Sequence, residues 1–301
     1  MELHELRNKF IQSLEIKKRS PHTIRAYGND LDQLVEYLGS EEPVDQLDEF
    51  AIHRFFQHLE TCGYKHNTKT RKRKAVLSML AYGQRKGWIP RDITVELTAG
   101  KYETSNKDNV LTEDEIVAFF AYMERQISDH TSYHKALGIR NRLIVELFLK
   151  TGCRIAEIAS IEKDKITPTS LTVVGKGEKE RTIPLFAKTA RWIDRYWTEA
   201  LPYFHASEYL FPSGSSGRHL SSRQIRDIIT KAGYAALGRH VHPHLLRHSF
   251  ATNLLAKDPS MTNLKRVSRI LGHVNPYFTL DTYIAASDDR DRDEMAVYLD
   301  Y

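Results

Sequence analysis

Apolar positions in the first hundred residues recur at the spacing of an α-helix. Between residues 24 and 38 they return every three or four positions, at Ile24, Tyr27, Leu31, Leu34, Val35 and Leu38. A segment with this pattern folds as a helix with one apolar face. Ser20 and Pro21 precede it as a preferred N-cap and first helical residue, and Gly39 marks its end. Runs of the same period at residues 50–59 and 67–86 lead us to predict a compact module of about four short helices.

A polar segment separates this module from the rest of the chain. Residues 100–109 read GKYETSNKDN and have no apolar period, which is typical of a linker. Thr112 and Glu115 then have the spacing of a capping box, so a new helix is expected to begin there. Residues 142–150 are apolar on nearly every side, which indicates a helix buried in a core. We predict a helical domain over 1–104, a linker over 105–109 and a second domain over 110–301.

One stretch of the second domain has the composition of strands. Residues 171–174 and 181–185 are rich in β-prone residues and are joined by the polar segment GKGEKE. We predict a β-hairpin or small sheet here, with Lys176 at its tip. The predicted fold class is therefore mainly α, with a helical first domain and a mixed, mostly helical second domain.

The composition excludes several classes of protein. A chain of 301 residues with 41% hydrophobic residues can bury two cores and does not have the composition of a disordered chain. No stretch reaches the eighteen or so consecutive apolar residues of a membrane helix, and the first ten residues lack the apolar region of a signal peptide. Cys62 and Cys153 are the only cysteines and form no CxxC pair, which excludes a zinc finger or a disulfide scaffold. We expect a cytoplasmic protein that does not enter a membrane.

Positive charge is concentrated in one part of the first domain. The net charge is +5, and nine basic residues between positions 65 and 91 are accompanied by no Asp or Glu. Such a run is either a solvated surface or a surface that binds phosphate. The candidates for contacts with DNA phosphates are Lys69, Arg71, Lys72, Arg73 and Lys74.

Residues suited to bind a phosphate stand at the start of a predicted helix in the second domain. His244 and Arg247 follow Pro243 and are three positions apart, so they share one helix face. A helix N-terminus that presents an imidazole and a guanidinium can hold a phosphate group, although such a pair alone is common on surfaces. Arg154 is a second cation of this kind, because it stands just past Gly152 at a predicted helix start, and Glu157, one turn later, can orient it.

The order of the motifs resembles that of the tyrosine recombinase family, the phage integrases and Xer-type site-specific recombinases. The N-terminal module and the linker are followed by TGCRIAEI at 151–158, VVGKGEKERTIPL at 173–185, HPHLLRHSFAT at 242–252, LGH at 271–273 and TLDTYI at 279–284. The resemblance implies a SAM-like core-binding domain followed by a catalytic domain. It also implies a catalytic set of six residues, Arg154, Lys176, His244, Arg247, His273 and Tyr283. In this set the two arginines bind the phosphate, the lysine is the hairpin lysine and the tyrosine is the nucleophile.

The nucleophile is the assignment that has a rival. Xer-type members usually place the tyrosine one residue nearer to the histidine of LGH than Tyr283 is to His273. Tyr277 follows that histidine more closely still, which leaves almost no chain between histidine and nucleophile. The residues TLDTYI also match the family's pattern around the tyrosine better, so we expect Tyr283 to be the nucleophile.

The resemblance further implies a DNA strand-exchange enzyme. It would cut and rejoin double-stranded DNA through a 3′-phosphotyrosine and a Holliday junction, as a homo- or hetero-tetramer on two recombination sites. No metal and no cofactor is implied, because arginines and a lysine occupy the charge-stabilising roles. One alternative is a non-catalytic DNA-binding architectural or regulatory protein, which needs neither the tyrosine nor the hairpin lysine. Another is a type IB topoisomerase, which the small N-terminal module disfavours. Chromosome-dimer resolution, integration and transposition all stay open as the biological process.

Overall fold

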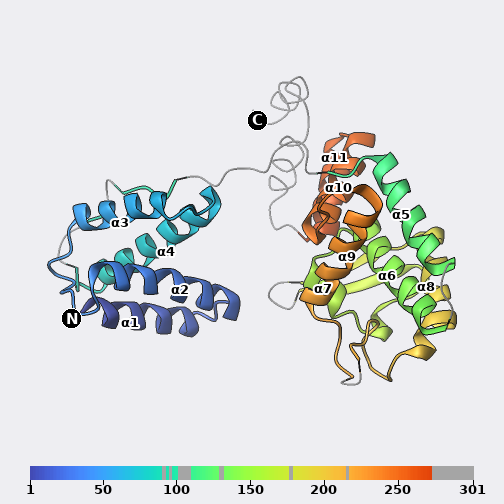
Figure 1. Cartoon of the computed structure of the whole chain (residues 1–301), viewed down its shortest axis with the longest axis horizontal. Coiled ribbons are helices and arrows are strands. Elements are labelled where there is room, and N and C mark those ends of the chain that lie inside the picture. The colour runs from blue at the N-terminus through green and yellow to red at the C-terminus, as the bar shows by residue number, and fades with distance from the viewer. Residues whose placement is uncertain are drawn as a thin grey trace. The chain divides into compact units, whose positions relative to one another are not determined.

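The computed structural model consists of two compact units, Met1–Thr104 and Ser105–Tyr301 (Figure 1). It describes residues 1–89, 93–94, 97–100, 110–128, 132–175, 179–214 and 217–272. Each unit has its own hydrophobic core. The linker expected at 105–109 lies outside the described residues.

The described part of the first unit is built of helices joined by loops. Its helices are α1 (Leu3–Ile16), α2 (Pro21–Leu38), α3 (Glu49–Thr61) and α4 (His66–Arg85). Helix α2 packs against the other three. Leu31 and Leu34 of its predicted apolar face are fully buried, and burying each such side chain stabilises the unit by roughly 1.5–3 kcal/mol.

The limits of α2 confirm the start and stop signals in the sequence. The Ser20 Oγ accepts a hydrogen bond from the Thr23 amide at 3.1 Å, which satisfies one of the unpaired N–H groups of the first turn. Pro21 is the first helical residue, where its missing N–H costs nothing. Gly39 follows the last residue with φ of +105°, a conformation that favours glycine and ends the helix.

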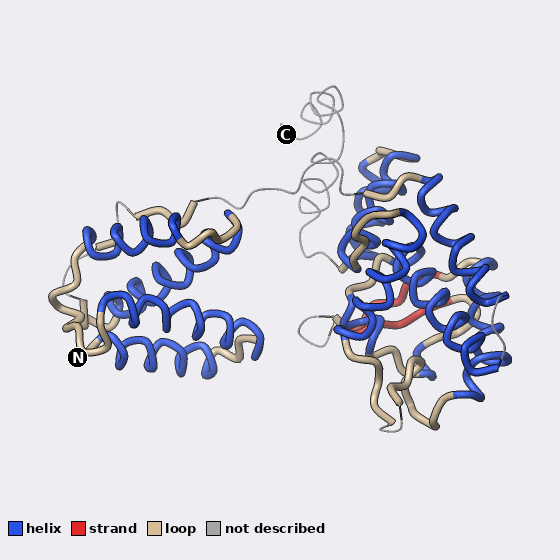
Figure 2. The backbone as a smooth tube through the Cα atoms, viewed as in Figure 1, coloured by secondary structure: helices blue, strands red, loops and turns tan. Residues whose placement is uncertain are grey.

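The second unit is mixed and mostly helical. Its long helices are α5 (Glu113–Ser128), α6 (Ser132–Thr151), α8 (Ala187–Arg195), α9 (Ser222–Leu237), α10 (Pro243–Lys257) and α11 (Met261–Leu271). Shorter helical segments are α7 (Ile155–Ala159), η1 (Lys163–Lys165), η2 (Tyr196–Ala200) and η3 (Leu201–Tyr203). The strands β1 (Ser170–Val174) and β2 (Glu180–Pro184) form an antiparallel pair, drawn in red in Figure 2.

Helix α6 is the centre of this unit. It contacts α5, α8, α9 and α10, and residues 142–149 are all buried, as the sequence predicted for an all-round apolar helix. The run includes one charged pair, in which Arg142 donates to Glu146 at 2.7 Å. The Arg142 guanidinium also lies 3.5 Å from the centre of the Phe120 ring and 4.4 Å from that of Trp192. This buried charge is therefore not left unpaired, because a carboxylate binds it and aromatic rings cover it.

The capping box and the hairpin expected in this unit are both present. The Thr112 amide donates to the Glu115 carboxylate at 2.9 Å, and the Glu115 amide donates to the Thr112 Oγ1 at 3.1 Å. In the hairpin, Leu171 pairs with Ile183 and Val173 pairs with Arg181. Leu171, Val173 and Ile183 are buried, so one face of the hairpin packs on the core.

Candidate active site

Arg154 is held at the N-terminus of α7 by a buried carboxylate. The Arg154 amide donates to Glu157 Oε2 at 2.7 Å, and its guanidinium donates to Glu157 Oε1 at 3.1 Å. The side chain of Glu157 is 4% exposed and that of Arg154 is 40% exposed. The Arg154 guanidinium is therefore held by a buried carboxylate while part of it stays open to solvent. This geometry agrees with the prediction that Glu157 orients Arg154.

A tight turn brings α6 to α7. Gly152 has φ of +61°, and a Cβ at this position would lie 2.5 Å from Phe250 Cδ1 and 2.7 Å from Leu271 Cδ2. The conformation and the crowding both require glycine. The turn at Gly152 therefore packs against Phe250 of α10 and Leu271 of α11.

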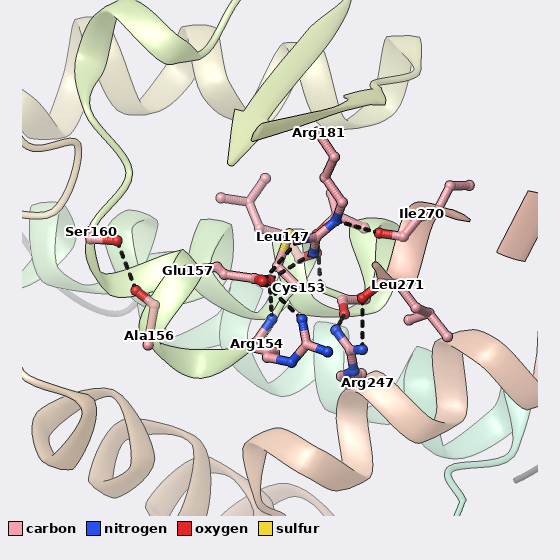
Figure 3. A network of polar contacts seen from close by, with 12 residues as sticks. Leu147, Cys153, Arg154, Ala156, Glu157, Ser160, Arg181, Arg247, Ile270 and Leu271 are labelled. Atoms are coloured by element: carbon pink, nitrogen blue, oxygen red, sulfur yellow. Dashed lines mark hydrogen bonds and ion pairs between the residues drawn. The ribbon is translucent and has the colours of Figure 1, made fainter. Parts of the chain in front are cut away.

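Arg247 lies deeper than its position on an exposed helix face predicts. It is 8% exposed, and its guanidinium donates to the Gly152 carbonyl at 2.5 Å and to the Leu271 carbonyl at 2.9 Å (Figure 3). Burial, together with the positive charge of Arg154, lowers the pKa of Arg247 to about 10, so the group stays a cation at neutral pH. The guanidinium connects the Gly152 turn to the end of α11.

His244 is in the first turn of α10, on the exposed side. The protein around its ring, with the positive charges of Arg247 and Arg154, lowers the pKa of His244. The ring is therefore neutral at pH 7 and can accept or donate a proton. On the same helix, Leu246 is fully buried, whereas Phe250 and Leu254 are half-buried.

Arg181 is a site residue that sequence analysis missed. It extends from β2 and binds both oxygens of Glu157, through Nη1 at 2.8 Å and Nη2 at 2.7 Å. Its Nε donates to the Ile270 carbonyl at 2.7 Å. Period-two alternation places Arg181 on the same strand face as the buried Ile183, which was the available signal that it points inward.

These contacts bring two guanidiniums, those of Arg154 and Arg181, onto one carboxylate. Burial raises the pKa of Glu157, but hydrogen bonds from Arg181 and Arg154 and their charges outweigh it, so the net pKa is lowered and the group is ionised. With Arg247 beside them, the described part of the site has an excess of positive charge around a surface formed by α7, α10 and β2 (Figure 3). Such a surface is suited to an anion that accepts several hydrogen bonds, as a phosphodiester does.

Neighbouring groups have structural roles. Cys153 is fully buried, and burial raises its pKa to about 11, so it is a core residue and not a reactive thiolate. His248 is half-buried with Nδ1 3.3 Å from the Thr252 Oγ1, as expected for a packing histidine. The ring of His242 accepts a hydrogen bond from the Leu245 amide at 3.1 Å and thereby caps α10.

Three members of the predicted catalytic set, Lys176, His273 and Tyr283, lie outside the described residues. So does Tyr277. In the ranges that the structure describes, no three His, Cys, Asp or Glu side chains are grouped so that they could hold a metal ion. No helix within those ranges is long and apolar enough to cross a bilayer.

The basic residues predicted to contact DNA lie on α4 of the first unit, where several have acidic partners. Lys69 and Arg73 both bind Glu60 of α3, the latter at 2.5 Å. Lys72 is 5% exposed and donates to Asp30 at 3.1 Å and to Gln33 at 2.8 Å. The Lys72 ammonium therefore serves the interior of the unit, and we do not expect it to reach a phosphate.

Arg71 and Lys74 complete this basic run. Arg71 binds Asp30, the same buried carboxylate that receives Lys72, and its own side chain is 37% exposed. Lys74 lines a surface cavity of about 650 Å³ with residues of α1 and α2. These two residues stay candidates for contacts outside the unit.

Comparison with known proteins gives consistent matches over both units. Residues 109–290 match the phage integrase family, and residues 8–87 match the N-terminal SAM-like domain of phage integrases. The chain is 26% identical over 282 residues to the tyrosine recombinase XerC of Staphylococcus saprophyticus, covering 91% of this chain and 90% of that protein.

Solved structures of similar fold include recombinases bound to DNA. A XerH site-specific recombinase in a post-cleavage complex with a palindromic difH substrate has a TM-score of 0.74 at 22% identity, covering 92% of this chain and 80% of that one. A lambda integrase tetramer bound to a Holliday junction has a TM-score of 0.74 at 18% identity, covering 96% of this chain and 79% of that one. The family match spans more than half of the chain and includes the segments that carry Arg154 and Arg247. The chain belongs to the phage integrase family and is a tyrosine recombinase, an enzyme that breaks and rejoins DNA.

Proposed function

We propose that this recombinase cleaves one DNA strand at a specific site by attack of Tyr283 on a phosphodiester held by Arg154 and Arg247. The observation that carries the proposal is the convergence of Arg154, His244 and Arg247. These residues come from two helix starts far apart in the sequence. Arg247 donates to the carbonyl of Gly152, two residues before Arg154, and the charge of each arginine lowers the pKa of His244.

The chemistry follows from the groups in the site. The nonbridging oxygens of the phosphate gain charge as the tyrosine oxygen attacks phosphorus, and guanidinium N–H groups stabilise that charge most in the transition state. The bond to the 5′-oxygen breaks as the bond from tyrosine to the 3′-phosphate forms. Lys176 supplies the proton that the leaving 5′-oxygen takes up, and His244, neutral at pH 7, takes part in the proton path from the tyrosine with His273.

The covalent bond to tyrosine conserves the energy of the cut strand, so rejoining needs no nucleotide cofactor. A 5′-hydroxyl from the second site attacks the phosphotyrosine and releases the tyrosine. Exchange of one strand at each site forms a Holliday junction, and four protomers on two sites complete the reaction. The lambda integrase tetramer on a Holliday junction, which has the same fold, supports this order of events.

We propose that the first unit holds the DNA while the second unit cleaves it. The match to the SAM-like domain of phage integrases and the basic residues of α4 support this role. Lys69, Arg71, Arg73 and Lys74 are the proposed phosphate contacts. The linker at 105–109 joins the two units, and the enzyme works in the cytoplasm. The XerC relative supports an Xer-type activity on double-stranded DNA.

Covalent capture on DNA tests the proposal. The protein is incubated with fragments of its own genome, and SDS-resistant adducts are recovered and mapped to find the recombination site. Tyr283→Phe removes a single hydroxyl, so DNA affinity is expected to stay at the wild-type value while the adduct disappears. Tyr277→Phe is the matched control and is expected to form the adduct normally. An adduct on Tyr283→Phe protein refutes the assignment of the nucleophile.

The same capture assay in EDTA tests the source of charge stabilisation. Because arginines and a lysine fill that role, adduct formation is expected to persist without divalent cations. Loss of cleavage in EDTA, with DNA binding intact, refutes this mechanism. Formation of Holliday junctions from two sites distinguishes recombination from relaxation of supercoils by a topoisomerase.

A further inference from the structure

The Glu157 carboxylate receives more hydrogen bonds from the Arg181 guanidinium than from the guanidinium of Arg154, the arginine proposed to bind DNA. Arg181 bonds each carboxylate oxygen through a separate nitrogen, at 2.8 and 2.7 Å. The guanidinium of Arg154 bonds the same carboxylate through one nitrogen, at the longer distance of 3.1 Å. Arg181 is thus the principal counter-ion of Glu157, and Arg154 is a lateral partner (Figure 3).

Burial makes this division of partners important. The side chain of Glu157 is 4% exposed and that of Arg181 is 13% exposed, so water cannot replace the ion pair. A buried carboxylate that loses a counter-ion takes another cation or a proton. Without Arg181, the nearest cation already in contact with Glu157 is the guanidinium of Arg154.

Arg181 also joins three segments of the site. It is the second residue of β2, close to the loop end of the hairpin, and the segment between the two strands includes Lys176 in the sequence. Its Nε donates to the Ile270 carbonyl near the end of α11, and Ile270 is three residues before His273 in the sequence. A Cβ on Gly272, which has φ of +67°, would lie 3.2 Å from the Arg181 Nη1, so the chain turns closely over the guanidinium. Arg181 therefore touches the hairpin, the start of α7 through Glu157, and the end of α11.

We propose that Arg181 is a positioning residue that keeps Arg154 available to the scissile phosphate. By binding Glu157 with both Nη atoms, it prevents that carboxylate from drawing the Arg154 guanidinium into a two-pronged ion pair. By binding the Ile270 carbonyl, it also fixes the hairpin against the end of α11. This inference rests on the proposed function, in which Arg154 binds the phosphate.

A suppressor experiment tests the charge argument. Arg181→Met leaves Glu157 without its main counter-ion, and cleavage under single-turnover conditions at saturating DNA is expected to fall by about 10²-fold, the cost of a misplaced catalytic group. Adding Glu157→Gln removes the unpaired charge while its amide oxygen still accepts from the Arg154 amide. The double variant is expected to recover at least about tenfold of the lost rate. Arg181→Lys, which keeps the charge but not the two-pronged contact, is expected to fall between the wild type and Arg181→Met.

The pH profile separates positioning from a purely structural role. Protonation of Glu157 removes the same charge as the glutamine substitution, so the deficit of Arg181→Met relative to the wild type is expected to shrink as pH falls. Rates are compared without urea, at a temperature where unfolding curves show that each variant is folded. Lys165→Met is the matched control, because it removes a cation from the exposed pair with Glu180, the residue next to Arg181 on β2. It is expected to cleave at the wild-type rate.

Each outcome decides one question. If folded Arg181→Met cleaves within about threefold of the wild type, or if the double variant is no faster than Arg181→Met at any pH, the inference is overturned. If Arg181→Met does not fold, the double variant is compared with Glu157→Gln alone, and Arg181→Lys is compared with the wild type. A double variant more than about tenfold slower than Glu157→Gln, or an Arg181→Lys variant as fast as the wild type, overturns the inference. Arg154→Met reports on the proposed function separately, because normal cleavage by that variant refutes phosphate binding by Arg154 whatever Arg181 does.

Discussion

Replacing Arg247 by alanine is expected to lower both stability and catalysis, by amounts that can be measured separately. The guanidinium donates to the carbonyls of Gly152 and Leu271, and it is 8% exposed. A buried acceptor that loses its donor costs about 1–3 kcal/mol. Water entering the vacated volume recovers part of this, so we expect Arg247→Ala to lower the free energy of unfolding by about 2–4 kcal/mol.

The catalytic loss has a different origin. Removing one preorganised donor from a charged transition state costs about 3 kcal/mol, which is a rate decrease of about 10²-fold. Ground-state binding of the DNA involves many phosphates, so affinity is expected to change far less than the cleavage rate. Arg247→Lys keeps the charge, but one ammonium cannot reproduce the planar fork between two carbonyls and a phosphate, and an intermediate rate is expected.

The assay combines three measurements on the same protein. Urea unfolding gives the stability, binding against salt gives the affinity, and single-turnover cleavage of a duplex that traps the covalent product gives the rate. Arg195→Ala is the matched control, because Arg195 belongs to a half-exposed pair with Glu199 on the same unit and is expected to leave cleavage unchanged. Folded Arg247→Ala protein that cleaves within about threefold of the wild type refutes the assignment of Arg247 to the phosphate.

Two further substitutions test the DNA surface and the turn that supports the site. Glu60→Gln removes the charge that binds Lys69 and Arg73. DNA affinity at low salt is therefore expected to rise by about two- to fivefold, and its salt dependence is expected to steepen. An unchanged affinity indicates that this face of α4 is solvated. Gly152→Ala requires a left-handed backbone and places a Cβ 2.5 Å from Phe250, so the free energy of unfolding is expected to fall by about 2–5 kcal/mol in urea titrations. Gly63→Ala is its control, since Gly63 has φ of +67° but no atom within 4 Å of the added Cβ, and only the backbone cost of about 1–2 kcal/mol is expected. Equal losses for the two glycine variants contradict the packing argument.

Local signals in the sequence predict most of the fold because they act over a few residues. Ser20, Pro21 and Gly39 set the limits of α2 through capping and backbone preference, which depend on neighbours alone. The Thr112 and Glu115 capping box and the β-prone runs of the hairpin are of the same kind. The second half of helix α6, over residues 142–150, was predictable because a segment without a polar face must be buried on nearly all sides.

The candidate site was predictable only where a motif carried it. Residue spacing places His244 and Arg247 on one face of α10, but it does not show that Arg247 lies inside, bonded to carbonyls from two other segments. Arg181 stands 24 residues from Glu157, and no local pattern specifies that contact. These are tertiary contacts, and the packing of α6, α10 and α11 determines them.

The basic run of α4 shows why a count of charges overstates the surface available to DNA. Asp30, which holds Lys72, has a side chain that is 2% exposed and lies 42 residues from it in the sequence. A carboxylate buried with its cation cannot move away to make room for a phosphate. The positive charge of Lys72 is therefore neutralised inside the unit. Glu60, which holds Lys69 and Arg73, has a side chain that is 47% exposed. Exposed ion pairs are weak and salt-sensitive, and a phosphate that arrives with many others can displace such a carboxylate. The capacity of this helix to bind DNA therefore depends on the exposure of each acidic partner, and Glu60 is the acidic partner that a DNA phosphate can displace.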